Sequence, residues 1–373
     1  MSESPTPSHR RKLSMSRRGV IGAAGAVAAS AALTPAVFAS TDSGETDNSA
    51  SGAGDSGTTQ GKFPATQTAA ATGAAETNTA FAASYIALRW TGTQHGAGIR
   101  FADGHAFPGI WQQVTGGCAT VDDGGTALVA AGNATTYHCK APAGASGVRS
   151  LAIDTTDGPH RTFKVPSDPT RLRGVHYVSR PGWGADESKR YKDGKVNSPE
   201  KYYPLQAITV HHTATPNDDP DPAATIRSIY EYHAITLDWG DIGYHFLIDE
   251  AGNIYEGRYS GHDGAPAFNT DGDLVTAFHT LGYNSGNIGI ALLGTLAKKA
   301  PTDAAKTSLI RLIKAIDRFK GLDPRAKITY VNPVDGTKKD VTTVSGHRDW
   351  LSTDCPGETM YDLLTKVRAA AAR

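Results

Sequence analysis

Three residues of this chain, His211, His347 and Cys355, form a candidate set of metal ligands. His347 and Cys355 lie eight positions apart in a segment that ends with Pro356-Gly357, whereas His211 ends an apolar run more than 130 residues earlier. Imidazole nitrogen and thiolate sulfur are ligands that zinc prefers. Three such ligands without an obvious fourth describe a zinc ion with an open coordination position. An open position holds a water molecule, which indicates hydrolysis rather than a structural role.

A fold must bring these ligands together, because neither helix nor strand periodicity places residues eight apart side by side. Helices and strands alternate after Gly174. Asp221-Pro222 predicts a helix N-terminus, and Gly321 is the expected C-cap of a second helix near 302–320. The turn at 250–253 predicts a hairpin. Apolar runs short enough for buried strands lie at 208–210, 244–248 and 288–293. The pattern therefore predicts a mixed α/β domain.

Six segments after Gly174 occur in the order that one known family shows. They are 179–185, 208–215, 241–248, 255–258, 279–290 and 346–357. Each segment alone is a modest signal, but six in order are highly specific. In these motifs residues 174–373 resemble the peptidoglycan recognition proteins and type-2 N-acetylmuramoyl-L-alanine amidases, a family that includes phage amidases. The resemblance implies an α/β fold with a mixed central sheet flanked by helices, a zinc cofactor, and hydrolysis of the amide that joins N-acetylmuramic acid to L-alanine in peptidoglycan.

The resemblance also implies which side chains hold the zinc ion, namely His211, His347 and Cys355. His212 competes with His211, because adjacent strand residues point to opposite faces and only one of the two can serve. The spacing alone leaves that choice open, whereas the family pattern selects the first histidine of the pair. Asp349 is a candidate for orienting His347, or alternatively for pairing with the neighbouring arginine.

Four further residues take functional roles by the same resemblance. Tyr244 matches the position whose hydroxyl faces the reacting water or the scissile carbonyl, and Thr353 matches a position that holds Lys in phage amidases. A threonine brings no positive charge to a developing oxyanion, so its contribution is limited to a neutral hydrogen bond. His233 and His279 match positions that line the substrate groove.

Composition limits the class of partner. The whole chain has no net charge, and residues 1–39 carry five basic residues against Glu3, so the rest of the chain is acidic by four charges. This balance argues against a nucleic-acid partner and against ionic tethering to an acidic membrane. The resemblance implies peptidoglycan as the partner, and we expect a monomeric enzyme. Two alternatives stay open, a peptidoglycan-binding protein without catalysis and a secreted zinc peptidase of other specificity.

Residues 1–39 indicate a cleaved export signal. Arg17-Arg18 precede a Gly/Ala-rich apolar stretch, and Ala39 supplies a small residue before the cleavage point, as in a bacterial twin-arginine signal. The apolar stretch is shorter than the ~20 residues that span a bilayer, so we expect no membrane anchor after cleavage. The sequence thus predicts a secreted, extracytoplasmic protein that associates with the cell wall.

Two segments separate the signal from the predicted catalytic domain. Residues 40–80 are rich in Ser, Thr, Gly and Ala, which predicts a disordered linker. Residues 81–165 alternate as strands do between Gly-rich turns, which predicts a small all-β domain, and we expect a sandwich. Cys118 and Cys139 lie in this domain and predict a disulfide, because export leads to a compartment that permits one. The pairing leaves Cys355 as the odd thiol, available to a metal.

Overall fold

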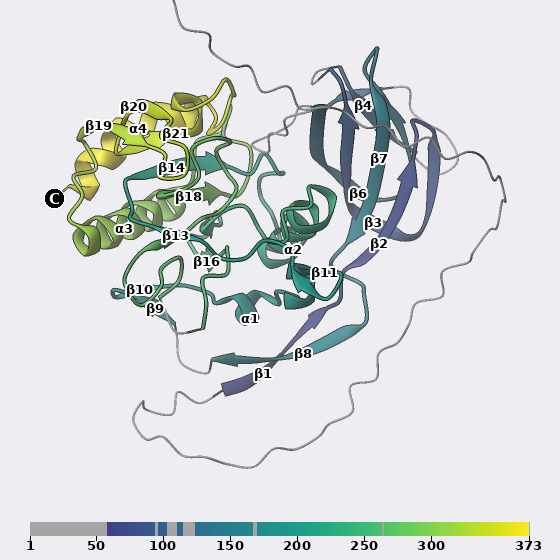
Figure 1. The fold of residues 1–373 in the computed structure, drawn as a ribbon. Helices are drawn as coiled ribbons and strands as arrows, with labels where there is room; N and C mark the ends of the chain where they lie inside the picture. Colours follow the sequence, from purple (N-terminus) through teal and green to yellow (C-terminus); the bar gives the residue numbers. More distant parts are fainter. Residues whose placement is uncertain are drawn as a thin grey trace, which may run out of the picture. The chain divides into compact units, whose positions relative to one another are not determined.

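The computed structural model describes residues 58–93, 96–102, 110–114, 124–166, 170–262 and 265–372. Residues from Gly54 to Arg373 form one compact unit. The predicted export signal at 1–39 and the first part of the predicted linker lie outside the described residues. Within the described part, no helix combines the length and the apolar character needed to cross a bilayer. Figure 1 shows the elements in their order along the chain.

A five-stranded mixed sheet forms the centre of the C-terminal region. Its strands are β14 (Ala207–His212), β15 (Phe246–Ile248), β16 (Ile254–Glu256), β18 (Asn287–Leu292) and β21 (Val344–Gly346). They lie in the order β16-β15-β18-β14-β21. β14 runs parallel to both β18 and β21, whereas β15 pairs antiparallel with β16. The strands predicted from the three apolar runs and the hairpin predicted at 250–253 are therefore confirmed.

Helices cover both faces of this sheet (Figure 1). They are α1 (Arg180–Trp183), α2 (Pro222–Glu231), α3 (Asp303–Lys320), α4 (Glu358–Ala371) and a π-helical turn, Tyr232–Thr236, that continues α2. The α3 and α4 helices pack on one apolar face, which includes Ile208 and Val210 of β14. The α2 helix packs on the other face, with Leu247 and Ala291. Since side chains alternate along a strand, His211 faces the α2 side.

The start of α2 and the end of α3 lie at the caps that the sequence predicted. The Asp221 side chain accepts a hydrogen bond from the Ala224 N–H at 3.0 Å, at the start of α2. Thr302 caps α3 in the same way through the Ala305 N–H at 3.1 Å. Gly321 ends α3 with a φ of 69°, a left-handed conformation that favours glycine. Local sequence thus sets the length of these helices, and packing on the sheet sets their direction.

Short ribbons and turns complete the C-terminal region. The ribbons pair β9 (Arg171–Leu172) with β10 (Val175–His176), β11 (Tyr191–Lys192) with β12 (Lys195–Val196), β13 (Tyr202–Tyr203) with β17 (Leu274–Val275), and β19 (Lys327–Val331) with β20 (Lys338–Thr342). Two 3₁₀ turns lie at Glu187–Arg190 and His347–Asp349. The second turn follows β21 directly, so it begins with a predicted metal ligand.

The described residues before 167 form a second, antiparallel sheet. Its strands β2 (Gln67–Thr72), β3 (Glu76–Thr91), β4 (Gly98–Phe101), β5 (Gln112–Gln113), β6 (Gly124–Lys140) and β7 (Ser146–Asp154) pair in the order β2-β7-β3-β6-β4-β5. The pairing of β3 with β6 shifts register between Asn78 and Ala83. Tyr137 of β6 and Ser150 of β7 are hydrogen-bonded at 2.8 Å across β3, on the face that carries the apolar core of this sheet. One six-stranded sheet and the separate pair β1 and β8 take the place of the two packed sheets of the predicted sandwich.

The predicted disordered linker at 40–80 is wrong for its second half. Residues 58–80 contribute β1 (Thr58–Pro64), β2 and the start of β3. β1 pairs antiparallel with β8 (His160–Pro166), and β2 pairs with β7. These Ala/Thr-rich segments bury little apolar surface themselves. They are ordered because each adds its backbone hydrogen bonds to a strand that other residues already hold in place.

The N-terminal sheet contacts the C-terminal region through α2 and the turn that follows it. Three buried pairs join them: Tyr85 with Thr225 at 3.1 Å, Thr155 with the Ala224 carbonyl at 2.8 Å, and Thr126 with Tyr232 at 2.7 Å. Every residue of α2 from Ala224 to Glu231 is buried. A helix that is buried all round needs an apolar neighbour on each side. Here the central sheet supplies one side and the N-terminal sheet the other.

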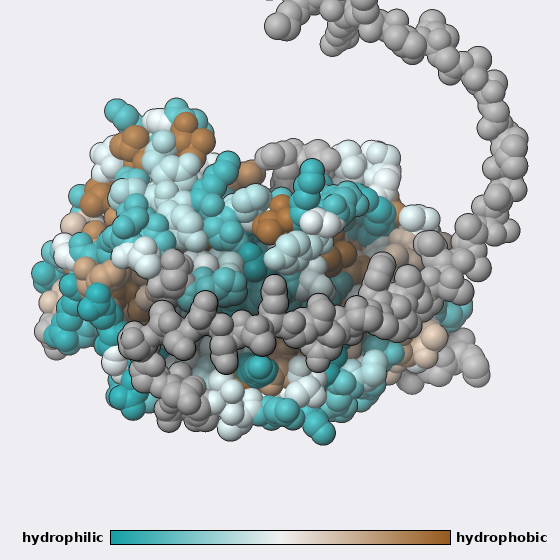
Figure 2. Space-filling model, turned by 60° about the horizontal axis from the view of Figure 1, so that its bottom comes forward, coloured by the Kyte–Doolittle hydropathy of each residue, from teal (hydrophilic) through white to brown (hydrophobic). Residues whose placement is uncertain are grey.

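Large apolar side chains at the described surface are scattered. The exposed ones are Ile110, Tyr191, Ile235, Leu281, Val331 and Val334. Figure 2 shows that, on the face it draws, hydrophobic patches are separated by hydrophilic residues. Single exposed apolar side chains are normal on a folded protein. The described residues that Figure 2 leaves uncovered on this face therefore form no large continuous apolar surface.

Candidate metal centre

The three predicted ligands meet at the carboxyl ends of two parallel strands. His211 lies near the end of β14, and His347 directly follows β21. Val210 pairs in register with Gly346, so the next residue of each strand sets two imidazole rings side by side, with centres 4.6 Å apart. Cys355 comes from the loop before α4 and places Sγ 3.5 Å from Nδ1 of His211. All three side chains are buried, and their ligand atoms lie within 4.8 Å of one another.

This donor set fits a zinc ion. Two ligands of one tetrahedral zinc ion lie roughly 3.5 Å apart, which is the separation of the Cys355 Sγ and the His211 Nδ1. Both ring nitrogens of His347 are buried and have no hydrogen-bond partner within the described part of the protein. Such a buried polar group calls for a partner, and a metal ion would be one. The cluster contains three residues among those described, so a bound ion would keep an open position.

A chain of hydrogen bonds from His211 through His279 to Asn287 determines which ring nitrogen of His211 carries the lone pair. The carbonyl of Asn287 can only accept, so Nε2 of His279, at 2.9 Å, carries a proton. Burial lowers the pKa of His279 to about 4, so the ring is neutral near pH 7 and its Nδ1 is an acceptor. That nitrogen lies 3.0 Å from Nε2 of His211, which must therefore donate. Nδ1 of His211 is left unprotonated beside Cys355, as a metal ligand requires.

His279 thus supports His211, and its predicted role in lining a groove stays a prediction. Its side chain is 3% exposed, and both ring nitrogens are engaged inside the protein. Asn284 holds the surrounding loop by accepting hydrogen bonds from the backbone N–H groups of His279 and Thr280, both at 2.8 Å. A Cβ atom on Gly289 would lie 2.5 Å from the His279 ring, so glycine leaves room for the ring. This support of His211 was not found by sequence reasoning, because it depends on residues brought together by folding.

The structure resolves the choice between the adjacent histidines. His211 lies in the cluster, whereas Nδ1 of His212 accepts a hydrogen bond from the Leu296 N–H at 3.1 Å. Burial lowers the pKa of His347 to about 3 and of His212 to about 4. Burial and the neighbouring histidines also hold the pKa of His211 well below its ordinary value. These imidazoles are therefore neutral near pH 7, which is the form that binds a metal.

Tyr244 and His233 lie next to the cluster. The ring centre of Tyr244 is 5.4 Å from that of His211, and its side chain is 4% exposed. The His233 ring lies 5.4 Å from the Tyr244 ring. The Gly243 N–H donates to Nδ1 of His233 at 3.0 Å, so His233 anchors the backbone just before Tyr244. His233 is itself buried, and its role in lining a groove stays a prediction.

A buried ion pair anchors the segment that carries Tyr244. Nη1 of Arg180 donates to Oδ1 of Asp241 at 3.0 Å, and both side chains are buried. Asp241 in turn accepts hydrogen bonds from the backbone N–H groups of Ile242, at 2.7 Å, and Tyr259, at 3.0 Å. Removing either charge would leave the other buried and unpaired, which is costly. The motif that contains Arg180 therefore positions the site from a distance.

Thr353 precedes Cys355 by two residues and is partly exposed. Its Oγ1 accepts a hydrogen bond from the Cys355 N–H at 3.3 Å. The hydroxyl proton is not used in that contact. Thr353 is thus placed to donate a hydrogen bond close to a ligand residue.

Neither predicted role of Asp349 holds. Its carboxylate accepts hydrogen bonds from the backbone N–H at the start of its own turn, at 2.8 Å, and from the Tyr361 hydroxyl, at 2.5 Å. Arg348 pairs with Glu358 at 2.7 Å rather than with Asp349. Asp349 closes the 3₁₀ turn instead of contacting the His347 ring, because a short turn offers its free N–H groups to a nearby carboxylate.

The predicted Cys118–Cys139 disulfide lies partly outside the described residues, because Cys118 is not among them. Cys139 is a free and buried thiol. Burial raises the pKa of Cys139 to about 12, so it stays protonated at neutral pH and is unreactive. Cys355 is the other cysteine of the described residues, and it lies in the metal cluster.

The fold and the site together define a mixed α/β protein with a buried three-ligand metal cluster. Residues 201–358 match the family described as N-acetylmuramoyl-L-alanine amidase. A human N-acetylmuramoyl-L-alanine amidase is 35% identical over 165 residues, which cover 43% of this chain and 24% of that protein. Peptidoglycan-recognition protein SC2 of Drosophila melanogaster is 32% identical over 193 residues, which cover 51% of this chain and 84% of that protein.

Among solved structures, Drosophila PGRP-LB matches with a TM-score of 0.38 and 24% identity, over 51% of this chain and 93% of that chain. The chain belongs to the family of peptidoglycan recognition proteins and N-acetylmuramoyl-L-alanine amidases. The matched region contains all three residues of the metal cluster. The chain spans about a quarter of the length of the human amidase.

Proposed function

We propose that this protein is a zinc-dependent N-acetylmuramoyl-L-alanine amidase. The reaction is hydrolysis of the amide between the lactyl group of N-acetylmuramic acid and the L-alanine of the peptidoglycan stem peptide. One observation carries the proposal: His211, His347 and Cys355 hold their ligand atoms within 4.8 Å in a chain of an amidase family. Three buried ligands with an open position suit hydrolysis, whereas binding alone does not need them.

A zinc ion held by these side chains would supply a Lewis acid and lower the pKa of its water from about 15.7 towards ~7. The other contributions come from the protein. His279 keeps Nδ1 of His211 aimed at the cluster. Tyr244, beside His211, is placed to donate its hydroxyl to the oxyanion that develops on the scissile carbonyl. Thr353 adds a neutral donor without adding charge.

Loss of one ligand tests the site and the activity together. On purified peptidoglycan, the wild type should release peptides that begin with L-alanine, read as new amino termini, and should contain zinc. Cys355→Ala removes a ligand atom of the cluster, so zinc content and hydrolysis should fall together. Cys139→Ala removes the other buried thiol, which lies in the N-terminal sheet, and should keep both.

Each alternative function predicts a different result. Full activity of Cys355→Ala without zinc would overturn the site assignment. A zinc-loaded wild type that binds muropeptides without cleaving them would be a binding protein. Cleavage of other peptides in a substrate panel, with intact peptidoglycan left uncut, would instead identify a zinc peptidase.

We further propose that the protein acts as a monomer on peptidoglycan outside the cytoplasm, after export by the twin-arginine route. That route carries folded proteins, so zinc would be bound before export. Changing Arg17 and Arg18 together to Lys should stop export in a host that has this pathway, measured by the protein in the medium and wall fractions. Normal export of that variant would contradict the signal assignment.

A further inference from the structure

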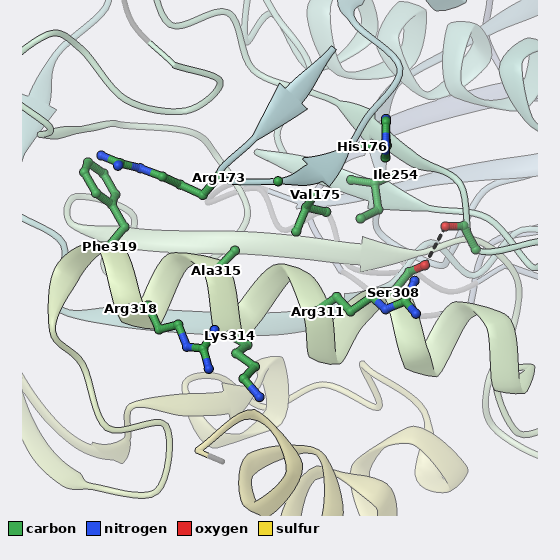
Figure 3. A pocket seen from close by; sticks show the side chains of 12 residues that line it. Arg173, Val175, His176, Ile254, Ser308, Arg311, Lys314, Ala315, Arg318 and Phe319 are labelled. Carbon is green, nitrogen blue, oxygen red and sulfur yellow. Dashed lines mark hydrogen bonds between the residues drawn. The ribbon is translucent and has the colours of Figure 1, made fainter. Parts of the chain in front are cut away.

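A basic cavity of ≈ 590 Å³ lies between α3 and the ribbon of β9 and β10 (Figure 3). Arg311, Lys314 and Arg318 line it from α3, and Arg173 and His176 line it from the ribbon and its turn. Among the described residues, no acidic side chain lines this cavity. The α3 helix covers one face of the central sheet, whereas the metal cluster lies on the other. The cavity is therefore separate from the candidate active site.

The protein itself does not neutralise these charges. In the part of the chain that the structure describes, none of the three α3 cations, nor Arg173, forms an ion pair with a carboxylate. Elsewhere on the same helix, Lys306 does pair with Asp303. The three α3 cations follow one another at intervals of three and four residues, so they share one helix face, where like charges repel. An anion in the cavity would remove that repulsion.

Arg173 is held in place for such an anion. Its guanidinium lies 4.3 Å from the centre of the Phe319 ring. Figure 3 shows the two side chains next to each other. An arginine that stacks by its flat face keeps its N–H edges available for oxygen acceptors. Arg173 and the α3 cations come from two different elements, and Figure 3 shows Lys314 and Arg318 pointing away from the ribbon, so the positive charge is spread along the cavity rather than gathered around one point.

We propose that this cavity binds phosphate groups, and that the phosphates belong to a phosphodiester polymer. Arginine and lysine together favour phosphate, because its several acceptor oxygens take hydrogen bonds from several donors at once. Four permanent positive charges exceed what one phosphate neutralises, so a chain of linked phosphates fits better than a single ion. The proposal does not rest on the amidase activity. It gives the protein a second binding site, apart from the candidate active site, for an anionic polymer.

The test measures binding of the full-length protein to poly(glycerol phosphate) as a function of salt. Arg311→Ala/Lys314→Ala/Arg318→Ala removes the α3 charges from a helix that alanine favours. This variant should bind at least about tenfold more weakly, with a shallower salt dependence, since lost phosphate contacts release fewer counterions. Lys327→Ala/Lys338→Ala/Lys339→Ala removes three charges from β19 and β20 as the matched control and should retain the affinity. Cys355→Ala should bind as the wild type does, whether or not the protein is an amidase.

Two further arms identify the source of the phosphate. Competition by inorganic phosphate at millimolar concentration would show that a single phosphate also occupies the cavity, and absence of competition would assign the site to the polymer alone. Both results support the proposal. It is overturned if the α3 variant binds the polymer like the wild type, if both triple variants lose the same affinity, or if polyglutamate binds as tightly as the phosphodiester polymer.

Discussion

His211 offers Nδ1 to the metal cluster because its Nε2–H is donated to His279. Without that acceptor, the imidazole of His211 is free to adopt the other tautomer. We expect His279→Leu to weaken zinc binding roughly 10- to 100-fold. His279→Gln keeps an acceptor oxygen and should restore most of the affinity, measured by competition with a chelator. His160→Leu, at an exposed position of β8, is the control, and equal affinity of all variants would show that β14 alone orients His211.

Tyr244 lies beside His211 but outside the three-residue cluster, and under the proposed function its hydroxyl acts on the reacting carbonyl. Tyr244→Phe keeps the buried ring in place and removes one donor. On a soluble muropeptide we expect kcat to fall about 100-fold, which corresponds to ~3 kcal/mol of lost oxyanion stabilisation. Zinc content should stay unchanged. Tyr203→Phe in β13 should leave kcat as it is, and loss of zinc from Tyr244→Phe would assign the tyrosine a structural role instead.

At the scale of the elements, the sequence predicted what local patterns encode. Apolar runs marked β14 and β18, and caps marked α2 and α3. The pairing of β14 with β21, which sets His211 beside His347, joins segments that lie far apart in the chain. No local pattern encodes such a contact. The contact of His279 with His211 was not predicted for the same reason, because it joins residues 68 positions apart and depends on the space left by Gly289.

The α3 helix carries a buried carboxyl that should make stability depend on pH. Both oxygens of Asp317 are buried without a hydrogen-bond partner among the described residues, and burial raises its pKa to about 7 from 3.8. The folded state therefore binds more protons than the unfolded state between these values, so stability falls as pH rises from about 4 to about 7. Asp317→Asn should raise the free energy of unfolding by about 1–2 kcal/mol at pH 8, with little gain at pH 4.

Urea unfolding at pH 4, 6 and 8 measures this difference. Asp303→Asn is the matched control, because Asp303 also lies on α3 but its pKa is lowered by a hydrogen bond from Lys306. Its replacement should give no gain that grows with pH. A gain for Asp317→Asn that stays constant from pH 4 to pH 8 would mean that the carboxyl is not protonated in the folded state.

At the scale of the whole molecule, the N-terminal sheet is part of the support of the site. It packs on α2, and the turn after α2 contains His233, which holds the backbone before Tyr244. The sequence predicted strands in this region but not this contact. The contact depends on polar side chains such as those of Tyr85 and Thr225. Burial of such residues cannot be predicted from their type alone.

Arg227 on α2 connects the two regions directly. Its guanidinium donates to the carbonyls of Thr155, in the N-terminal region, and Trp183, in α1, both at 3.0 Å, and the side chain is buried. Arg227→Met keeps most of the side-chain volume but leaves both carbonyls without this donor, which should cost about 2–4 kcal/mol. Arg149→Met, at an exposed position of β7, should change the free energy of unfolding by less than about 0.5 kcal/mol.

Because the contact is buried, the N-terminal sheet and the central sheet should unfold together. Far-UV circular dichroism reports strands of both sheets, whereas the tryptophan fluorescence of a Trp90→Phe/Trp111→Phe background reports the C-terminal region alone, which holds the other three tryptophans, Trp183, Trp239 and Trp350. In this background both signals should therefore follow one denaturant transition. In Arg227→Met the transition should move to lower denaturant, and the two signals should separate if this arginine is the main link. Two separate transitions already in the background with Arg227 intact would instead mean that the N-terminal sheet folds independently and that the buried pairs at α2 contribute little to cooperativity.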